Sequence, residues 1–158
     1  MSGTYTLSLS VNGEEITCAI DPRRNLVDFL REDLQLTGTH VGCEHGVCGA
    51  CTLRVNGEIV RGCLMLAVQA EGAKVETIEG VSDSGEIADL QEEFHKRNAP
   101  QCGFCTPGFL MLATGVLEKQ PNISDTELRH VLSSNLCRCT GYQNILEAVK
   151  ATRTLMKS

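Results

Sequence analysis

Eight of the nine cysteines in this 158-residue chain fall into two groups of four. The first group reads C-x4-C-x2-C followed by a lone cysteine, a spacing by which four thiolates hold a [2Fe–2S] cluster. The second group reads C-x2-C and then C-x-C. The first group is Cys43, Cys48, Cys51 and Cys63, and the second is Cys102, Cys105, Cys137 and Cys139. Two metal sites in so short a chain indicate a relay for electrons rather than a single binding site.

A structural zinc ion is the alternative for both groups. Zinc sites usually combine paired C-x2-C elements, which the first group matches poorly. The second group contains one such element, so by spacing alone a four-cysteine zinc site stays open there. A redox pair formed by Cys102 and Cys105 also stays open, although no βαβ pattern surrounds it. The ninth cysteine, Cys18, alternates with Ile16 and Ile20, and we expect it to be a small buried hydrophobic residue.

Composition excludes several classes of function. The chain has 14 Lys and Arg against 20 Asp and Glu, and no basic block, so the usual electrostatic signature of nucleic-acid binding is missing. No apolar run approaches the roughly 20 residues of a membrane span. The sequence has no recognisable signal peptide, which predicts a cytoplasmic protein. Clustered cysteines in a reducing cytosol indicate metal ligands rather than disulfides.

The first half of the chain has the pattern of a small sheet that positions the first cysteine group. Alternating apolar residues over 5–11 and 16–20 flank Asn12-Gly13, the preferred type I′ hairpin turn, and a second hairpin turns at Asn56-Gly57. We expect Asp21-Pro22 to open a short helix, residues 38–51 to form the cysteine-rich loop, and Val75 to Ile78 to form the last strand. Two hairpins, one helix and a closing strand are what a β-grasp ferredoxin domain needs.

The second half is predicted to be helical. Residues 79–86 are polar and glycine-bearing and read as a linker. Four amphipathic helices follow, with cysteines at their ends. Their predicted features are an apolar stripe from Ile87 to Phe94, a second helix capped by Thr106 with Pro107 first, a capping box at Ser124 to Glu127, and a last apolar stripe from Ile145 to Leu155. The fold class is α+β, with a plant-type [2Fe–2S] ferredoxin domain over 1–80 and a four-helix-bundle [2Fe–2S] domain over 81–158.

Three strings in the chain resemble the cluster motifs of the molybdenum hydroxylases. The family includes xanthine dehydrogenase, aldehyde oxidoreductase, carbon monoxide dehydrogenase and bacterial hydroxylases of N-heteroaromatic rings. The order and spacing of the strings match, and the resemblance covers nearly the whole chain. The strings are GCEHGVCGACT at 42–52, QCGFCTPG at 101–108 and CRCTGY at 137–142.

The resemblance implies the small iron–sulfur subunit of a multi-chain enzyme. It implies a large subunit with molybdopterin, expected in its cytosine dinucleotide form, and a medium subunit with FAD, in a heterotrimer or a dimer of heterotrimers. Electrons would pass from molybdenum through the second cysteine group, then the first, to FAD. Gln101 and Cys139 match positions that approach the pterin. No catalytic residue is expected on this chain.

The resemblance leaves the substrate open. The Glu-His-Gly-Val version of the first motif favours an N-heteroaromatic compound, while an aldehyde, a purine, CO or an aromatic acyl-CoA are alternatives. Two other functional classes are a free-standing two-cluster ferredoxin and a zinc-binding adaptor. A free carrier has no evident use for the 101–108 element, and it would purify without partner chains.

Overall fold

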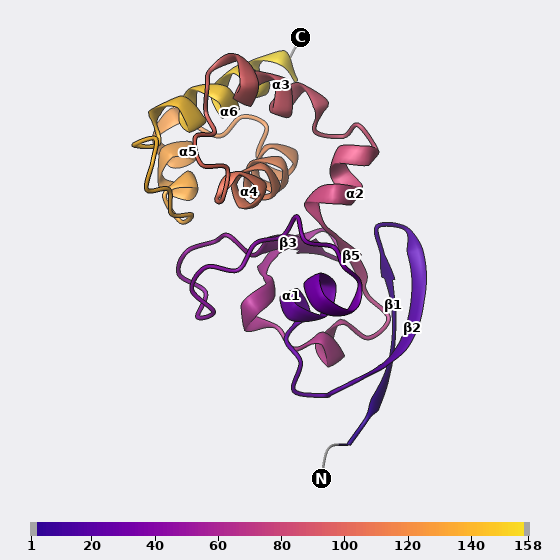
Figure 1. The fold of residues 1–158 in the computed structure, drawn as a ribbon. Coiled ribbons are helices and arrows are strands. Elements are labelled where there is room, and N and C mark those ends of the chain that lie inside the picture. The colour runs from indigo at the N-terminus through magenta and orange to yellow at the C-terminus, as the bar shows by residue number, and fades with distance from the viewer. Residues whose placement is uncertain (1–2, 157–158) are drawn as a thin grey trace.

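The computed structural model of the chain describes residues 3–156. A five-stranded sheet forms the first half and helices form the second, as the α+β prediction requires (Figure 1). The strand order is β2-β1-β5-β3-β4, in which β1 and β5 are parallel and the other neighbours antiparallel. The strands are Tyr5–Val11 (β1), Glu14–Ile20 (β2), Thr52–Val55 (β3), Glu58–Arg61 (β4) and Lys74–Glu76 (β5).

Both predicted hairpin turns are confirmed. Asn12 and Gly13 have φ values of 51° and 85°, and Asn56 and Gly57 have values of 50° and 79°. A type I′ turn requires positive φ at both central residues, and asparagine and glycine tolerate it best. The second turn matters for the site because it places β4 so that Cys63, just beyond the strand, returns beside the cysteine-rich loop.

The short helix begins later than predicted. It consists of α1 (Leu26–Asp28), continued by a π-helical turn, η1 (Phe29–Asp33). Asp21-Pro22 does not open it, because the cap is Asn25, whose side-chain oxygen accepts a hydrogen bond from the Asp28 N–H at 2.8 Å. The helix buries its apolar residues against the sheet. Those with no exposed surface are Leu26, Val27, Phe29 and Leu30.

The predicted linker is wrong in part, since a helix, α2 (Ile78–Asp83), occupies most of 79–86. The last strand accordingly ends at Glu76 rather than at Ile78. Ile78 and Val81 lie one helical turn apart and are 8% and 1% exposed. Their burial in the helical half of the molecule offsets the weak helix propensity of the surrounding glycine and serines.

The four predicted helices all form, preceded by α2. The Ser124 capping box is confirmed, because the Ser124 hydroxyl accepts from the Glu127 N–H at 3.2 Å and the Glu127 carboxylate accepts from the Ser124 N–H at 3.1 Å. Two short 3₁₀ helices follow β4. The bounds are Ala88–Lys96 (α3), Thr106–Lys119 (α4), Asp125–Leu132 (α5), Gln143–Leu155 (α6), Gly62–Leu64 (η2) and Ala67–Ala70 (η3).

The start of α4 differs by one position from the prediction. Thr106 is the first helical residue rather than the cap, and Cys105 holds the cap position. The carbonyl of Cys105 accepts the N–H of Phe109 at 3.1 Å, which is the first bond of the helix. A cysteine of the second group therefore sits at the helix N-terminus, where free N–H groups and the helix dipole favour negative charge.

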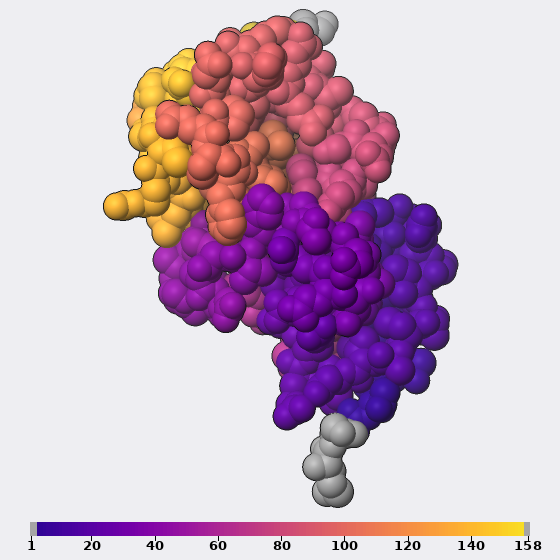
Figure 2. All heavy atoms as spheres, in the orientation of Figure 1, coloured from indigo at the N-terminus to yellow at the C-terminus, as the bar shows by residue number. Residues whose placement is uncertain are grey.

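The two halves bury separate apolar clusters and press against each other (Figure 2). Helix α4 lies against β3. At this interface Arg54 of β3 is 6% exposed and contacts three carboxylates, those of Glu86 at 2.7 Å, Glu118 at 3.0 Å and Glu76 at 3.3 Å. The guanidinium thus joins the sheet to two segments of the helical half.

Replacing Arg54 by methionine should lower the thermal unfolding midpoint by about 5–10 °C, because three partly buried carboxylates lose their counter-charge. The midpoint is read by far-UV circular dichroism of the metal-loaded chain. Arg23→Met is the matched control, since the Arg23–Asp21 pair is exposed and should leave the midpoint unchanged. Equal midpoints for both variants would contradict this role of Arg54.

Candidate metal centres

The first cysteine set (Cys43, Cys48, Cys51 and Cys63) is brought together from two segments of the chain. Three members lie in the loop before β3, and Cys63 lies in η2 after β4. The Cys48 N–H donates to the Cys43 sulfur at 3.3 Å. The Cys63 thiol interacts with the thiols of Cys51 and Cys43. All four thiols therefore face a common region.

Backbone N–H groups are directed at this set. The N–H groups of Cys48, His45 and Val47 hydrogen-bond to the Cys43 sulfur and lower the pKa of this thiol to about 6. The Gly46 N–H faces the Cys63 sulfur, and Gly46 adopts a φ of 83°, which a residue with a side chain would adopt only with strain. Such N–H donors stabilise thiolates and the extra negative charge of a reduced cluster.

Burial acts in the opposite direction on Cys63. Burial, followed by the proximity of the Cys51 thiol, raises the pKa of Cys63 to about 11. Four thiolates could therefore coexist here only with positive charge between them. Iron ions bound by the four sulfurs would provide that charge, so the donor set fits an iron–sulfur cluster.

The second cysteine set (Cys102, Cys105, Cys137 and Cys139) is assembled from the segment before α4 and the loop between α5 and α6. The Cys102 thiol contacts that of Cys139, and the Cys105 thiol contacts that of Cys137. The Phe104 N–H hydrogen-bonds to the Cys102 sulfur and lowers the pKa of Cys102. Four thiols again converge, with a backbone donor on one of them.

Cys105 and Cys137 lie deeper than the other two members of the second set, and the pKa values of their thiols are shifted in opposite directions. Burial, and then the neighbouring Cys137 thiol, raise the pKa of Cys105 to about 12. Burial also opposes ionisation of Cys137, but the Thr140 hydroxyl at 3.2 Å and the N–H groups of Cys139 and Thr140 outweigh it and lower the pKa of Cys137. The arrangement matches the first set in combining buried thiols with nearby hydrogen-bond donors.

Tyr142 supports the second set, a role that its place in the CRCTGY string did not reveal. Its backbone is left-handed, with a φ of 70°, and its hydroxyl accepts the N–H of Cys137 at 3.0 Å. Its ring meets the edge of Phe109 at 6.2 Å between centroids. The side chain therefore links the cysteine loop to the buried face of α4.

The two residues expected to approach a pterin lie beside the same thiol. Gln101 is exposed and directly precedes Cys102. Cys139 is exposed and contacts the Cys102 thiol. Both predicted residues are thus on the outer edge of the second set, whereas Cys105 and Cys137 lie on its inner side.

The two sets are directly connected. The N–H of Leu136, next to Cys137, donates to the carbonyl of Cys48 at 2.8 Å. At a second contact, the rings of His40 and Phe104 stack 4.9 Å apart, and the His40 Nδ1 lies 2.7 Å from the Phe104 carbonyl. These contacts between segments distant in the sequence could not be read from cysteine spacing.

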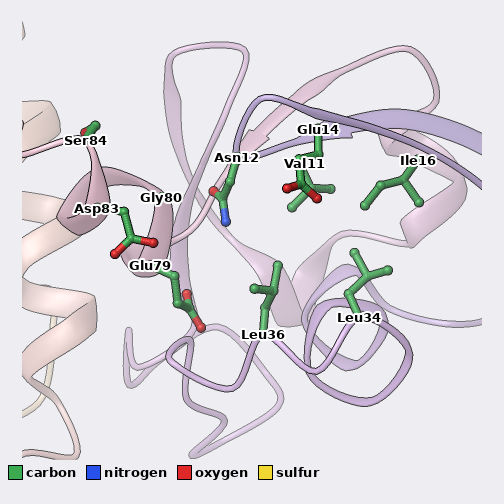
Figure 3. A pocket seen from close by; sticks show the side chains of 10 residues that line it. All are labelled: Val11, Asn12, Glu14, Ile16, Leu34, Leu36, Glu79, Gly80, Asp83 and Ser84. Carbon is green, nitrogen blue, oxygen red and sulfur yellow. The ribbon is translucent and has the colours of Figure 1, made fainter.

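A cavity of about 520 Å³ elsewhere in the molecule is lined by none of the cysteines (Figure 3). It lies between the β1–β2 hairpin, the segment after η1 and helix α2. Leu34, Leu36 and Ile16 face it from one side, and Glu79 and Asp83 from the other. The Glu79 carboxylate accepts hydrogen bonds from the Gly38 N–H at 2.7 Å and the Thr77 hydroxyl at 2.6 Å, so it serves to join two segments.

Within residues 3–156, no three His, Cys, Asp or Glu side chains are placed to share one metal ion. A two-iron cluster does not require such a group, because each iron takes only two of the four thiolates. None of the helices in this range has the length and hydrophobicity that a bilayer crossing requires. Cys18 is half-buried rather than buried as predicted, although it packs against the apolar cluster of the first half, and burial raises the pKa of its thiol.

The thiols should differ in reactivity when the chain is prepared without metal. At pH 7, Cys43 should react with iodoacetamide at least about tenfold faster than Cys105, because only Cys43 is largely thiolate at that pH. Mass spectrometry of tryptic peptides measures the rates, with Cys18 as the internal slow control. Modification of Cys105 or Cys18 as fast as that of Cys43 would contradict the described hydrogen bonds.

Comparison with known proteins agrees with this geometry. Residues 9–77 match the model of a 2Fe-2S iron-sulfur cluster binding domain, and residues 77–150 match that of a [2Fe-2S] binding domain. The gamma subunit of caffeine dehydrogenase from a Pseudomonas species is 54% identical over 151 residues, covering 94% of this chain and 90% of that subunit. The small subunit of nicotine 6-hydroxylase from Paenarthrobacter nicotinovorans is 53% identical over 148 residues, covering 94% and 89%.

A solved structure extends the similarity to the fold. The crystal structure of quinoline 2-oxidoreductase from Pseudomonas putida 86 superimposes with a TM-score of 0.91 at 45% identity, covering 97% of this chain and 94% of the matched chain. Identity at this level over nearly the full length of both chains shows common descent. This chain belongs to the family of small iron–sulfur subunits of the molybdenum hydroxylases.

Proposed function

We propose that this chain carries electrons through two [2Fe–2S] clusters, one held by the first cysteine set and one by the second. As a member of its family, the chain is a subunit of an oxidoreductase whose catalytic site lies on another chain. The observation that carries the assignment is the pairing of two four-thiol sets through the Leu136–Cys48 hydrogen bond. When bound, each cluster supplies a one-electron redox centre, and the residues around it hold and shield it.

Each half of the molecule is proposed to be a domain that holds one of the two clusters. We place the domain boundary between residues 80 and 81, which lies within α2. The separate apolar clusters of the two halves support a division near this point, although Ile78 already packs with the helical half. Helices α3 to α6 then form a four-helix bundle that carries the second set, while α2 connects it to the β-grasp domain. A reducing cytoplasm suits free thiols awaiting iron and is the proposed location.

The partners are a large subunit with a molybdopterin cofactor, in its cytosine dinucleotide form, and a medium subunit with FAD. Together with this chain they form a heterotrimer or a dimer of heterotrimers. The exposed outer edge of the second set, at Cys102 and Cys139, suits entry of electrons from a pterin in another chain. The first set, whose loop carries the exposed Val47, then faces the flavin.

The proposed substrate of the complex is an N-heteroaromatic compound. The names of similar proteins support this class: caffeine dehydrogenase, nicotine 6-hydroxylase, nicotinate dehydrogenase and quinoline 2-oxidoreductase. Another relative is named for xanthine, which is a purine like caffeine, whereas a further relative is named for aldehydes. We expect the purified complex to reduce an electron-accepting dye with nicotine, quinoline or caffeine, and preferential turnover of aldehydes would contradict the assignment.

Removing one ligand from each set should remove one cluster at a time. The intact chain should hold about four iron ions, and Cys51→Ser and Cys105→Ser should each hold about two. Cys18→Ser is the matched control and should keep all of the iron. Iron and acid-labile sulfide analysis measures the outcome. Full iron content in either ligand variant, or zinc in place of iron, would contradict the assignment.

Gln101 and Cys139 are proposed to contact the pterin. In the assembled enzyme, Gln101→Ala should slow reduction of the iron–sulfur centres by substrate about threefold to tenfold, through loss of one hydrogen bond near the pterin. Stopped-flow absorbance measures this rate. Gln120→Ala, at the exposed far end of α4, is the matched control. Unchanged rates and unchanged pterin content in Gln101→Ala would refute the contact.

A further inference from the structure

The loops of the two cysteine sets approach each other more closely than most side chains would allow. Gly108, in the first turn of α4, faces the carbonyl of Gly49 in the first loop. A Cβ added at Gly108 would lie 2.4 Å from that oxygen, which is far inside van der Waals contact. The neighbouring residue of Gly49 is Cys48, whose own carbonyl accepts the Leu136 N–H. Glycine at position 108 therefore permits the contact between the sets.

A buried asparagine, Asn135, binds the same Gly49 carbonyl. Asn135 is 1% exposed, and its Nδ2 donates to the Gly49 carbonyl at 3.3 Å. The same carbonyl accepts the Thr52 N–H at 3.2 Å and the Thr52 hydroxyl at 2.6 Å. Arg61 donates both to the Thr52 hydroxyl and to the Ser134 carbonyl, so it ties the β3–β4 hairpin to the end of α5. Gly49 is thus held from both halves of the molecule.

The Asn135 side chain is not an ordinary space-filling residue. Its Oδ1 is buried and makes no hydrogen bond within the described residues. Leaving a buried acceptor unpaired is unfavourable, and an apolar side chain of similar size would avoid this cost. The role of the amide therefore lies in its Nδ2, which donates a hydrogen bond to the Gly49 carbonyl. Gly49 leaves it room, because a Cβ there would lie 2.0 Å from the Asn135 oxygen.

We propose that Asn135, together with Gly49 and Gly108, is a positioning device that fixes the separation of the two cysteine sets. This inference rests on the proposed function. In the electron transfer that this separation would control, one electron would leave the second site, which becomes oxidised, and enter the first site, which becomes reduced. No covalent bond forms or breaks, and no proton moves.

The first test inserts a methyl group between the loops. The full-length chain carrying both clusters is reduced by a light flash, and the rate at which electrons re-equilibrate between the two sites is followed by absorbance. Gly108→Ala should slow this rate severalfold, because the added methyl group would push the two loops apart and lengthen the path between the sites. The magnetic splitting between the two reduced sites, read by EPR, should shrink with it.

Gly115→Ala is the matched control. It lies on the same helix and the same interface, and its added Cβ would overlap the Ile59 side chain at 2.3 Å, but it does not touch either cysteine loop. Its thermal unfolding midpoint should fall, while the electron rate and the EPR splitting stay as in the parent chain. A slowed rate in Gly115→Ala equal to that in Gly108→Ala would overturn the proposal, because general loosening of the interface would then explain both.

Asn135→Leu is a second test of the proposal, and it does not rely on forcing an added methyl group into a tight contact. It removes both the Nδ2 donor and the unpaired oxygen, so both clusters should still assemble while the electron rate falls and the Leu136 amide exchanges hydrogen faster. Unchanged rate, splitting and amide exchange in a fully loaded Asn135→Leu would overturn the positioning role. A parent chain that fails to hold two reducible clusters would instead overturn the proposed function, so the two failures are distinguishable.

Discussion

Mutual repulsion among clustered thiolates is the constraint on which this structure depends. Four sulfurs that must ionise together need positive charge between them and N–H dipoles around them. The first loop supplies N–H groups from Cys48, His45 and Val47 to one sulfur. The second set obtains them from backbone N–H groups, the Thr140 hydroxyl and the helix terminus at Cys105. Glycine and left-handed residues recur in these loops because the backbone must turn tightly to direct its donors inward.

The interface between the two halves keeps the loops of the two cysteine sets in contact. A ferredoxin-like sheet and a helical domain could each hold its own metal centre, but a relay also needs their loops in contact. Arg54 and its three carboxylates fasten one part of the interface, and Gly49, Gly108 and Asn135 fasten the part next to the cysteines. The first part is electrostatic, and the second combines the close approach of the two glycines with the hydrogen bond from Asn135 to the Gly49 carbonyl.

Much of this could be predicted from local sequence patterns. Asparagine–glycine pairs located both hairpins, and the Ser124 capping box located α5, because these signals act over two to four residues. The sequence predicts a linker where helix α2 forms, because glycine and serine are frequent in 79–86 and the burial of Ile78 and Val81, which favours the helix, cannot be read from the local sequence. Asn135 had no local signal at all, since its partner Gly49 is 86 positions away.

The central claim is that two unlike [2Fe–2S] centres lie side by side on this chain. EPR spectra of the dithionite-reduced protein, recorded over a range of low temperatures, test it most directly. The account predicts two S = 1/2 signals that relax differently, because the first set combines the loop before β3 with η2, whereas the second lies between helix ends. A single signal, or none, from chain fully loaded with metal would contradict it, since the second cysteine set would then hold something other than a [2Fe–2S] cluster.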